Sequence, residues 1–286
     1  AAVLQRKRRY LRVKGPVLDT CGTGGDELGT FNISSLSAII ASACGAVVAK
    51  HGNRAVSSLS GSADFFKELG IAIDLDPVQS EKLVEKTKFV FLFAPLYHSA
   101  MRHAAQARRE MGIKTIMNLL GPLVNPAGAE YQIIGVYADH LCLDVARAAR
   151  MLGIKRVMVV HGFDGQDEIS VTGPTRIVMI DENDNLCEEV FHPEKLGIKL
   201  YQLKELKGGS APENARAALE ILLRSGSPAV REAVLLNAGA GLFVYGCAGS
   251  IEEGYKLAGQ ALSEGKAKMK LDEIIEESNR LKQVRN

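Results

Sequence analysis

Residues 16–54 decide the fold, and they read PVLDTCGTGGDELGTFNISSLSAIIASACGAVVAKHGNR. The apolar run 16–21 is typical of a buried strand, and a glycine-rich loop follows it. Residues 33–44 have the small and apolar side chains of a buried helix that Gly45 would end, and 46–50 predict the next strand. A strand, helix and strand in this order indicate a parallel sheet.

The same alternation continues along the chain. Further strands are predicted at 89–93, 131–137 and 156–160, with helices from Asp76-Pro77 and over 139–152. After residue 164 the pattern changes to two strands, 176–180 and 186–191, joined by a polar turn as an antiparallel hairpin at one edge. Helices follow at 212–223, 228–245 and 250–262 and from Leu271. The sequence therefore predicts an α/β fold, a mostly parallel sheet flanked by helices.

Composition excludes several classes of protein. The 286 residues are 47% hydrophobic and 24% charged, which is typical of a globular chain. No apolar stretch is long enough to span a membrane, and we expect a cytoplasmic protein. The five cysteines contain no CxxC pair, which argues against a disulfide framework or a zinc ribbon. The net charge is +2, but residues 6–14 hold six basic side chains, a run more typical of a solvated helix face than of a nucleic-acid patch.

The first candidate site is Gly22-Thr23-Gly24-Gly25-Asp26, between a predicted strand and a predicted helix. Glycines let backbone N–H groups crowd around a phosphate, and the helix N-terminus adds positive potential. The spacing fits neither GxGxxG nor GxxxxGK[ST], so a dinucleotide site or an ATP P-loop is not indicated. A plain tight turn is the alternative.

The second candidate, KHGNR at 50–54, lies at the carboxyl end of the next predicted strand, and serines follow it. Ligands of open parallel sheets bind beyond this edge, so cations and hydroxyls there suit a multiply phosphorylated anion. The third is HGFDGQDE at 161–168, in which adjacent carboxylates could bind Mg²⁺ with few other protein ligands. A solvated polar loop is the alternative in both cases.

The fourth candidate is a predicted helix at 95–111 that is rich in histidine and arginine. It is unusual within an α/β series and indicates a small helical lobe. An arginine there could bind a substrate carboxylate, although a surface helix with exposed arginines is the alternative. His98 and His103 are five residues apart, which does not favour a zinc site.

Taken in order, the motifs GTGGD, FNIS, KHGNR, SGSAD, AP…H…MRH…RRE, NLLGPLVNP and HG…DE closely resemble those of the anthranilate phosphoribosyltransferases of tryptophan biosynthesis. The resemblance runs from about residue 15 to about residue 265. It implies a nucleoside phosphorylase-like fold and transfer of 5-phosphoribosyl from its 1-pyrophosphate to the anthranilate amine. The small-molecule substrates imply no nucleic-acid or membrane partner, and the family is usually homodimeric.

The resemblance also assigns residues by position, with none dedicated to catalysis: Lys50, Asn53 and Arg108 would position substrates. Anthranilate would bind Gly22, Asn53 and Arg108, and two Mg²⁺ ions would bind Ser34, Asp167 and Glu168. The donor would bind Gly22, Gly25, Asp26, Thr30, Asn32, Ile33, Ser34, Ser35, Lys50, His51, Gly52, Asn53, Arg54, Ala55, Val56, Ser57, Ser58 and Ser62.

Two departures from the family pattern stand out. Glu27 follows the GTGGD motif where the family commonly has glycine. The family also places several helices before the GTGGD strand, so residues 1–15 are expected to be a remnant of its helical lobe. Residues 16–286 would then form the α/β domain, with 95–112 contributing to the lobe.

Two other functions are compatible with parts of this sequence. A pyrimidine nucleoside phosphorylase would use free phosphate and give Asp167 and Glu168 no metal to bind. A nucleic-acid-binding relative with a degenerate site would use the basic run at 6–14, but the intact GTGGD, KHGN and DE motifs argue against it.

Overall fold

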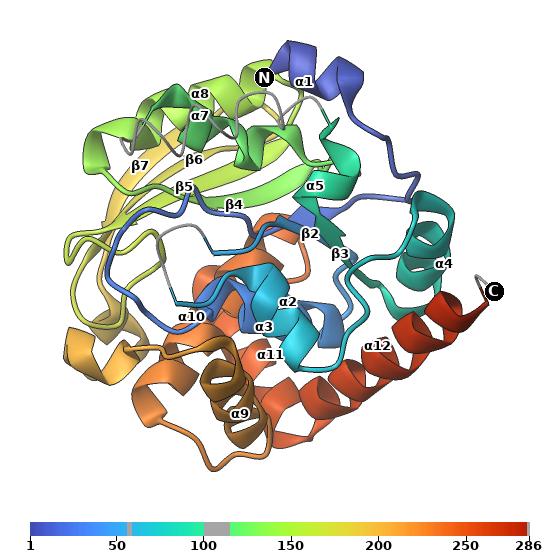
Figure 1. Cartoon of the computed structure of the whole chain (residues 1–286). Helices are drawn as coiled ribbons and strands as arrows, with labels where there is room; N and C mark the ends of the chain where they lie inside the picture. Colours follow the sequence, from blue (N-terminus) through green and yellow to red (C-terminus); the bar gives the residue numbers. More distant parts are fainter. Residues whose placement is uncertain (56–58, 100–114, 285–286) are drawn as a thin grey trace.

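The computed structural model describes residues 1–55, 59–99 and 115–284. Seven strands form one sheet in the order β3-β2-β1-β4-β5-β6-β7. The first five strands are parallel, and β6 and β7 pair antiparallel at one edge. The predicted mostly parallel α/β sheet with an edge hairpin is therefore confirmed (Figure 1).

The strands lie close to their predicted positions. They are β1 Leu18–Asp19, β2 Val48–Gly52, β3 Phe89–Phe93, β4 Tyr131–Gly135, β5 Arg156–Gly162, β6 Thr175–Ile180 and β7 Leu186–Phe191. In the parallel strands alternate side chains are buried on opposite faces, which explains their continuous apolar runs.

Helices cover both faces of the sheet. On one face α2 (Ile33–Ala43) and α10 (Pro228–Tyr245) pack on Val48, Ile133 and Met158. On the other face α4 (Pro77–Thr87) packs near β3, and α8 (Cys142–Met151) packs on β5 and β6.

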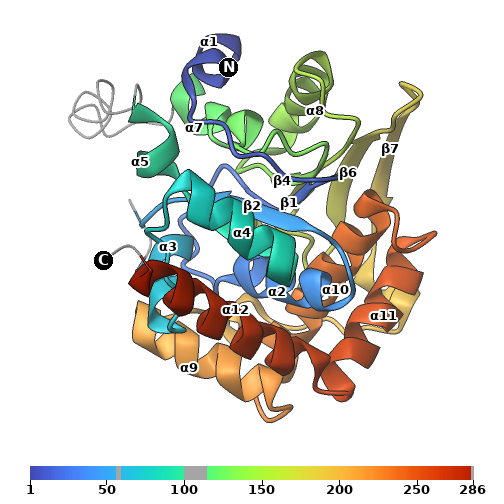
Figure 2. The same cartoon turned by 90° about the vertical axis from the view of Figure 1, so that its right-hand side faces the viewer.

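Local signals start and end these helices. Asp76 caps α4 by accepting a hydrogen bond from the Gln79 N–H at 2.9 Å, and Pro77 occupies the first turn. The remaining C-terminal helices are α9 (Ala211–Leu222), α11 (Ile251–Ser263) and α12 (Lys266–Gln283), which Figure 2 shows lying along the layer that holds α2 and α10. Among the described residues no helix is both long and apolar enough to cross a membrane.

Short helices gather at one end of the sheet. They are α1 (Ala2–Lys7), α5 (Ala94–Tyr97), α7 (Ile116–Leu120) and the 3-10 turn η2 (Pro122–Val124) (Figure 2). The Arg9 N–H donates to the Tyr97 carbonyl at 2.9 Å, which joins the N-terminal segment to α5. The basic run at 6–14 thus begins in a helix and shares this end of the molecule with α5 and α7.

One sequence prediction needs correction here. The helix expected at 95–111 does not continue through His98, whose φ of −119° and ψ of 64° are not helical, and residues 100–111 of that prediction lie outside the described residues. Thr115 caps α7, which η2 follows in the NLLGPLVNP segment. Ser62, one of the predicted donor-binding residues, begins α3 (Ser62–Glu68).

Candidate active site

The candidate site lies where the strand order reverses. From β1 the chain builds β2 and β3 to one side, and β4 then pairs on the other side of β1. Ligands of open α/β sheets bind beyond the carboxyl ends of the strands at such a switch point. The Thr23 N–H donates to the Gly135 carbonyl at 2.8 Å, so the glycine loop after β1 rests on the end of β4.

The glycine loop takes a conformation that other residues rarely adopt. Gly24 and Gly25 have φ of 61° and 82°, in the left-handed region that favours glycine. Both a tight turn and a phosphate-binding loop use glycine in this conformation. Glu27 also has a positive φ of 61°, so the departure from the family pattern puts a side chain where glycine would be unstrained.

The acidic pair Asp167 and Glu168 reaches this loop from β5. The Gly24 N–H donates to Asp167 Oδ2 at 2.9 Å, and the Ser34 N–H donates to Glu168 Oε1 at 3.2 Å. Desolvation raises the pKa of both carboxyl groups, and the neighbouring carboxylates Asp26 and Asp167 raise the pKa of Asp167 and of Glu168 further. Lys50 lowers both pKa values, but the net shift stays upward, so its charge does not fully offset burial and repulsion.

Those carboxylates line a small space of about 10 Å³, the room of about one water molecule, together with Ser34 and Gly22. No cluster of three or more His, Cys, Asp or Glu side chains suited to a metal occurs in the described parts of the chain. Two carboxylates and a hydroxyl are hard oxygen donors, and Mg²⁺ typically takes one or two protein carboxylates together with substrate phosphates. The residues present therefore fit Mg²⁺ bound jointly with a phosphorylated ligand.

Lys50 is buried beside this space, with 2% of its surface exposed. Its ammonium group donates to the Thr20 carbonyl at 2.8 Å, to Thr20 Oγ1 at 3.2 Å and to Ser34 Oγ at 3.2 Å. These bonds use all three of its protons. Lys50 thus orients the Ser34 hydroxyl next to the acidic pair.

Two glycines make room for the acidic pair. A Cβ on Gly135 would lie 1.6 Å from the Asp167 carbonyl oxygen, and a Cβ on Gly22 would lie 2.9 Å from Asp167 Oδ2. The Asp167 main chain is thus packed against the end of β4, which argues against the alternative of a solvated polar loop. Sequence reasoning missed Gly135, although a glycine at the end of a parallel strand is a usable signal of close approach.

The segments around Asn32 are joined by a small amide network. The Asn32 amide donates to the Ser60 carbonyl at 3.1 Å and accepts from Ser60 Oγ at 3.0 Å and from Asn214 Nδ2 at 2.8 Å. Asn214, at the start of α9, was also missed. Ile33 and Ser35 belong to the same predicted set, but their side chains are buried, so at most their backbone could reach a ligand.

Arg54 and Lys50, the cations expected at this edge of the sheet, have different partners in the structure. Arg54 Nη1 donates to Asp64 Oδ1 at 2.8 Å, and the Ala55 N–H donates to Asp64 Oδ2 at 3.1 Å. Asp64 therefore holds this end of the loop against α3. Gly52 is tightly approached, since a Cβ there would lie 2.2 Å from Ser62 Oγ.

A buried network explains the NLLGPLVNP motif. Asn125 Nδ2 donates to Asp19 Oδ2 at 2.6 Å and to the Ala49 carbonyl at 2.8 Å, which ties β1 and β2 together. Asp19 Oδ1 accepts from the His51 N–H at 3.1 Å, and burial raises the pKa of Asp19 to about 6. The His51 ring is buried against the His98 ring, with centroids 5.1 Å apart, and desolvation lowers the pKa of His51 to about 3.

Of the remaining predicted site residues, Asn53 and Thr30 lie within the described part of the chain. Asn53 is exposed and accepts from the Arg54 N–H at 2.8 Å, and Thr30 forms an isolated bridge with Lys207. Val56, Ser57, Ser58 and Arg108 lie outside the described residues.

Known proteins are similar to this chain in sequence. The family model described as "Glycosyl transferase family, a/b domain" matches residues 14–268. An anthranilate phosphoribosyltransferase of Petrotoga mobilis is 45% identical over 280 residues, which cover 98% of this chain and 81% of that protein. This chain belongs to the anthranilate phosphoribosyltransferase family.

Solved structures of the family agree with the fold. The crystal structure of anthranilate phosphoribosyltransferase from Thermus thermophilus superposes with a TM-score of 0.91 at 40% identity, covering 97% of this chain and 83% of that one. The enzyme from Saccharomyces cerevisiae in complex with PRPP and Mg gives a TM-score of 0.89 at 29% identity, covering 98% and 78%. The yeast enzyme has also been solved with 4-fluoroanthranilate. The resemblance drawn from the sequence motifs is therefore confirmed.

Proposed function

We propose that this chain transfers the 5-phosphoribosyl group from 5-phosphoribosyl 1-pyrophosphate to the amine of anthranilate and releases pyrophosphate, in tryptophan biosynthesis. The observation that carries the proposal is the position of Asp167 and Glu168 beside the glycine loop at the switch point of the sheet. Carboxylates beside an anion-binding loop would repel a bound phosphate, and a metal ion between them would remove that repulsion. Membership of the family supplies the identity of the substrates.

The chemistry needs positioning more than a strong base. An amine attached to an aromatic ring is mostly unprotonated at neutral pH, and carbon 1 of the ribose becomes cationic as pyrophosphate leaves. When bound, Mg²⁺ neutralises charge on the departing pyrophosphate. The chain's own residues would orient the reactants and exclude water around carbon 1. We assign no covalent intermediate.

We propose the following individual roles from the family resemblance and, where the residues are described, from their contacts. Ser34, Asp167 and Glu168 would hold the metal, and we propose two ions. Lys50 orients Ser34 and adds positive charge near the leaving group. The loops at 22–35 and 50–62 would bind the donor, while Gly22, Asn53 and Arg108 would bind anthranilate. We further propose a cytoplasmic homodimer, as the family resemblance implies.

The decisive assay follows the loss of anthranilate fluorescence with phosphoribosyl pyrophosphate and Mg²⁺. Turnover that requires both supports the transferase. Turnover of a pyrimidine nucleoside with inorganic phosphate, and none with anthranilate, would support the phosphorylase alternative instead.

The acceptor assignment has its own test in two neighbouring arginines. Arg108→Ala should raise the KM for anthranilate about ten- to a hundredfold and leave the KM for the donor nearly unchanged, because a charged hydrogen bond in a partly desolvated site contributes roughly 1.5–3 kcal/mol. Arg109→Ala is the control, since the family resemblance assigns the anthranilate carboxylate to Arg108 alone. Equal damage from both substitutions would refute the assignment.

A further inference from the structure

A buried asparagine on α10 binds the main chain next to the acidic pair. Asn237 has 3% of its surface exposed. Its Oδ1 accepts from the Ile169 N–H at 3.0 Å, and its Nδ2 donates to the Ile169 carbonyl at 2.9 Å and to the Ala233 carbonyl at 2.9 Å. One side chain therefore satisfies both backbone groups of Ile169, as a neighbouring strand would.

Ile169 directly follows Glu168, so this clamp acts at the acidic pair itself. Asn237 also lines the small space that Asp167, Glu168 and Ser34 enclose. Inside the loop, Asp164 accepts from the Gln166 N–H at 3.1 Å and from Ser170 Oγ at 2.5 Å. Asp164 thus forms hydrogen bonds within the loop, whereas Asn237 joins the loop to α10.

The same helix also anchors the other side of the space. Ser37, one turn after Ser34 on α2, shares its Oγ proton between the Ile33 carbonyl of its own helix at 2.8 Å and the Val234 carbonyl of α10 at 2.9 Å. Consequently α10 fixes the main chain beside Glu168 and the helix that carries Ser34. Two like charges held close together repel, and a loop that carries them needs such anchoring to keep them in place.

We propose that Asn237 is a positioning residue that sets the affinity of Asp167 and Glu168 for Mg²⁺. The proposal rests on the function proposed above, because it assumes that these carboxylates bind the metal of the donor complex. Residues that orient metal ligands typically change metal affinity or activity about ten- to a hundredfold when they are replaced.

The test is calorimetric binding of phosphoribosyl pyrophosphate at limiting and at saturating Mg²⁺. Asn237→Ala should weaken donor binding roughly ten- to a hundredfold at limiting Mg²⁺. Most of that loss should disappear at saturating Mg²⁺, because mass action refills a weakened metal site. Since Asn237→Ala leaves two buried backbone groups unpaired, Asn237→Ser is the milder second variant and should show the same dependence to a smaller degree.

The matched control is Asn279 on α12. Its Nδ2 donates to the Gly70 carbonyl at 2.7 Å and to the Ile275 carbonyl at 2.8 Å, the same combination of a loop carbonyl and the carbonyl four residues earlier in the helix. Asn279→Ala should leave donor affinity unchanged at both Mg²⁺ concentrations, although it too removes a side chain that joins a helix to a loop.

Each remaining outcome decides the matter. An equal loss at both Mg²⁺ concentrations, or no loss, would overturn the role of Asn237 while leaving the proposed function intact. Failure of the unmodified protein to bind the donor even at saturating Mg²⁺ would overturn the proposed function itself.

Discussion

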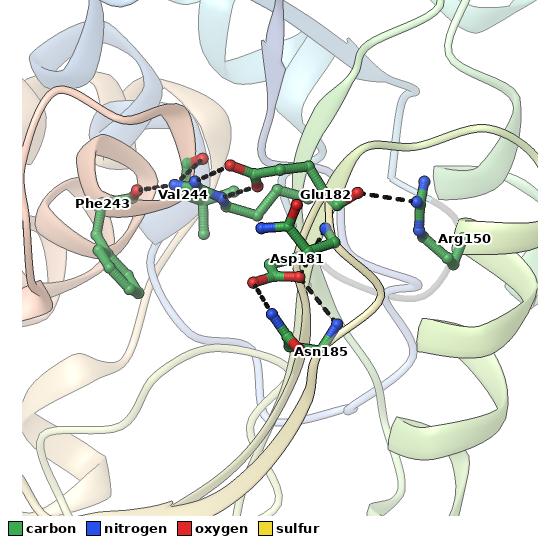
Figure 3. A network of polar contacts seen from close by, with 8 residues as sticks. Arg150, Asp181, Glu182, Asn185, Phe243 and Val244 are labelled. Atoms are coloured by element: carbon green, nitrogen blue, oxygen red, sulfur yellow. Dashed lines mark hydrogen bonds and ion pairs between the residues drawn. The ribbon is translucent and has the colours of Figure 1, made fainter.

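Carboxylates at the two ends of the parallel strands have opposite environments, which raise the pKa values at one end and lower them at the other. At the edge remote from the site, Arg156 donates through Nε and Nη2 to both Glu182 oxygens, at 2.9 and 2.8 Å, and through Nη1 to the Phe243 carbonyl at 3.2 Å. Asp181 beside them accepts from the backbone and side chain of Asn185 (Figure 3). These hydrogen bonds lower the pKa of Glu182 and of Asp181.

At the site edge, Asp167 and Glu168 each accept one backbone N–H, from Gly24 and Ser34 respectively. Desolvation raises the pKa of each. At the remote edge, hydrogen bonds from Arg156 and Asn185 stabilise the charged forms of the carboxylates. At the site edge, the two carboxylates lie close together, and their hydrogen bonds do not offset the cost of burial and repulsion. The missing positive charge is what a metal ion would bring, and each prediction below tests one side of this contrast.

The largest expected effect comes from removing the two site charges. Asp167→Asn with Glu168→Gln should lower activity at limiting Mg²⁺ by about a hundredfold or more, because direct ligands should matter at least as much as the residues that orient them. The folded state should not lose stability, since the substitutions relieve repulsion. The measurement is the Mg²⁺ dependence of turnover together with thermal unfolding. Normal turnover at limiting Mg²⁺ would refute the metal assignment.

The next largest effect is expected from changing Gly135, against which the Asp167 main chain packs. Gly135→Ala places a Cβ 1.6 Å from the Asp167 carbonyl oxygen, so the loop must move and activity should fall roughly ten- to a hundredfold. Gly259→Ala is the control, because a Cβ there meets nothing within 4 Å and alanine favours the helix. Kinetics of both variants at several Mg²⁺ concentrations provide the measurement. If Gly135→Ala keeps full activity, the close approach has no functional role.

Much of this contrast could be predicted from the sequence, because it depends on local patterns. Apolar runs located the strands within a few residues, and the polar turn at 183–185 predicted the hairpin. The motifs placed Asp167, Glu168 and Lys50 at the same edge of the sheet. The family resemblance added the identity of the substrates, which no local pattern could supply.

What the sequence missed depends on contacts between distant segments. Gly135 contacts Asp167 by close approach, and Asn237 binds Ile169 through buried hydrogen bonds. A glycine at a strand end signals only that something approaches closely, and Asn237 has no local signature. The helix expected at 95–111 was wrong at His98, where the backbone is not helical and the ring packs against His51 from a distant strand. Sequence spacing also could not show that Arg54 would bind Asp64.

A smaller effect is expected at the remote edge, on stability alone. Arg156→Leu should lower the free energy of unfolding by about 1–2 kcal/mol, since it unpairs Glu182 and leaves the Phe243 carbonyl without this donor. Donor affinity and turnover should not change. Chemical denaturation and steady-state kinetics of the variant are the measurements. A change in the Mg²⁺ requirement would show that the two edges are coupled.

The smallest effect is a pH dependence at Glu182. Because Arg156 lowers the pKa of this carboxyl below its ordinary value of 4.5, its contribution to stability is present above that value and is lost as the pH falls through the lowered pKa. Both partners are partly exposed to solvent, so we expect Glu182→Gln to cost at most about 1 kcal/mol at pH 7. The stability difference between the unmodified protein and Glu182→Gln should then shrink as the pH is lowered below 4.5, and added salt should reduce it at neutral pH. Urea denaturation of both proteins over this pH range measures it. A difference that stays constant across the range would mean that the ion pair does not produce the shift, and that Glu182 contributes through packing or neutral hydrogen bonds.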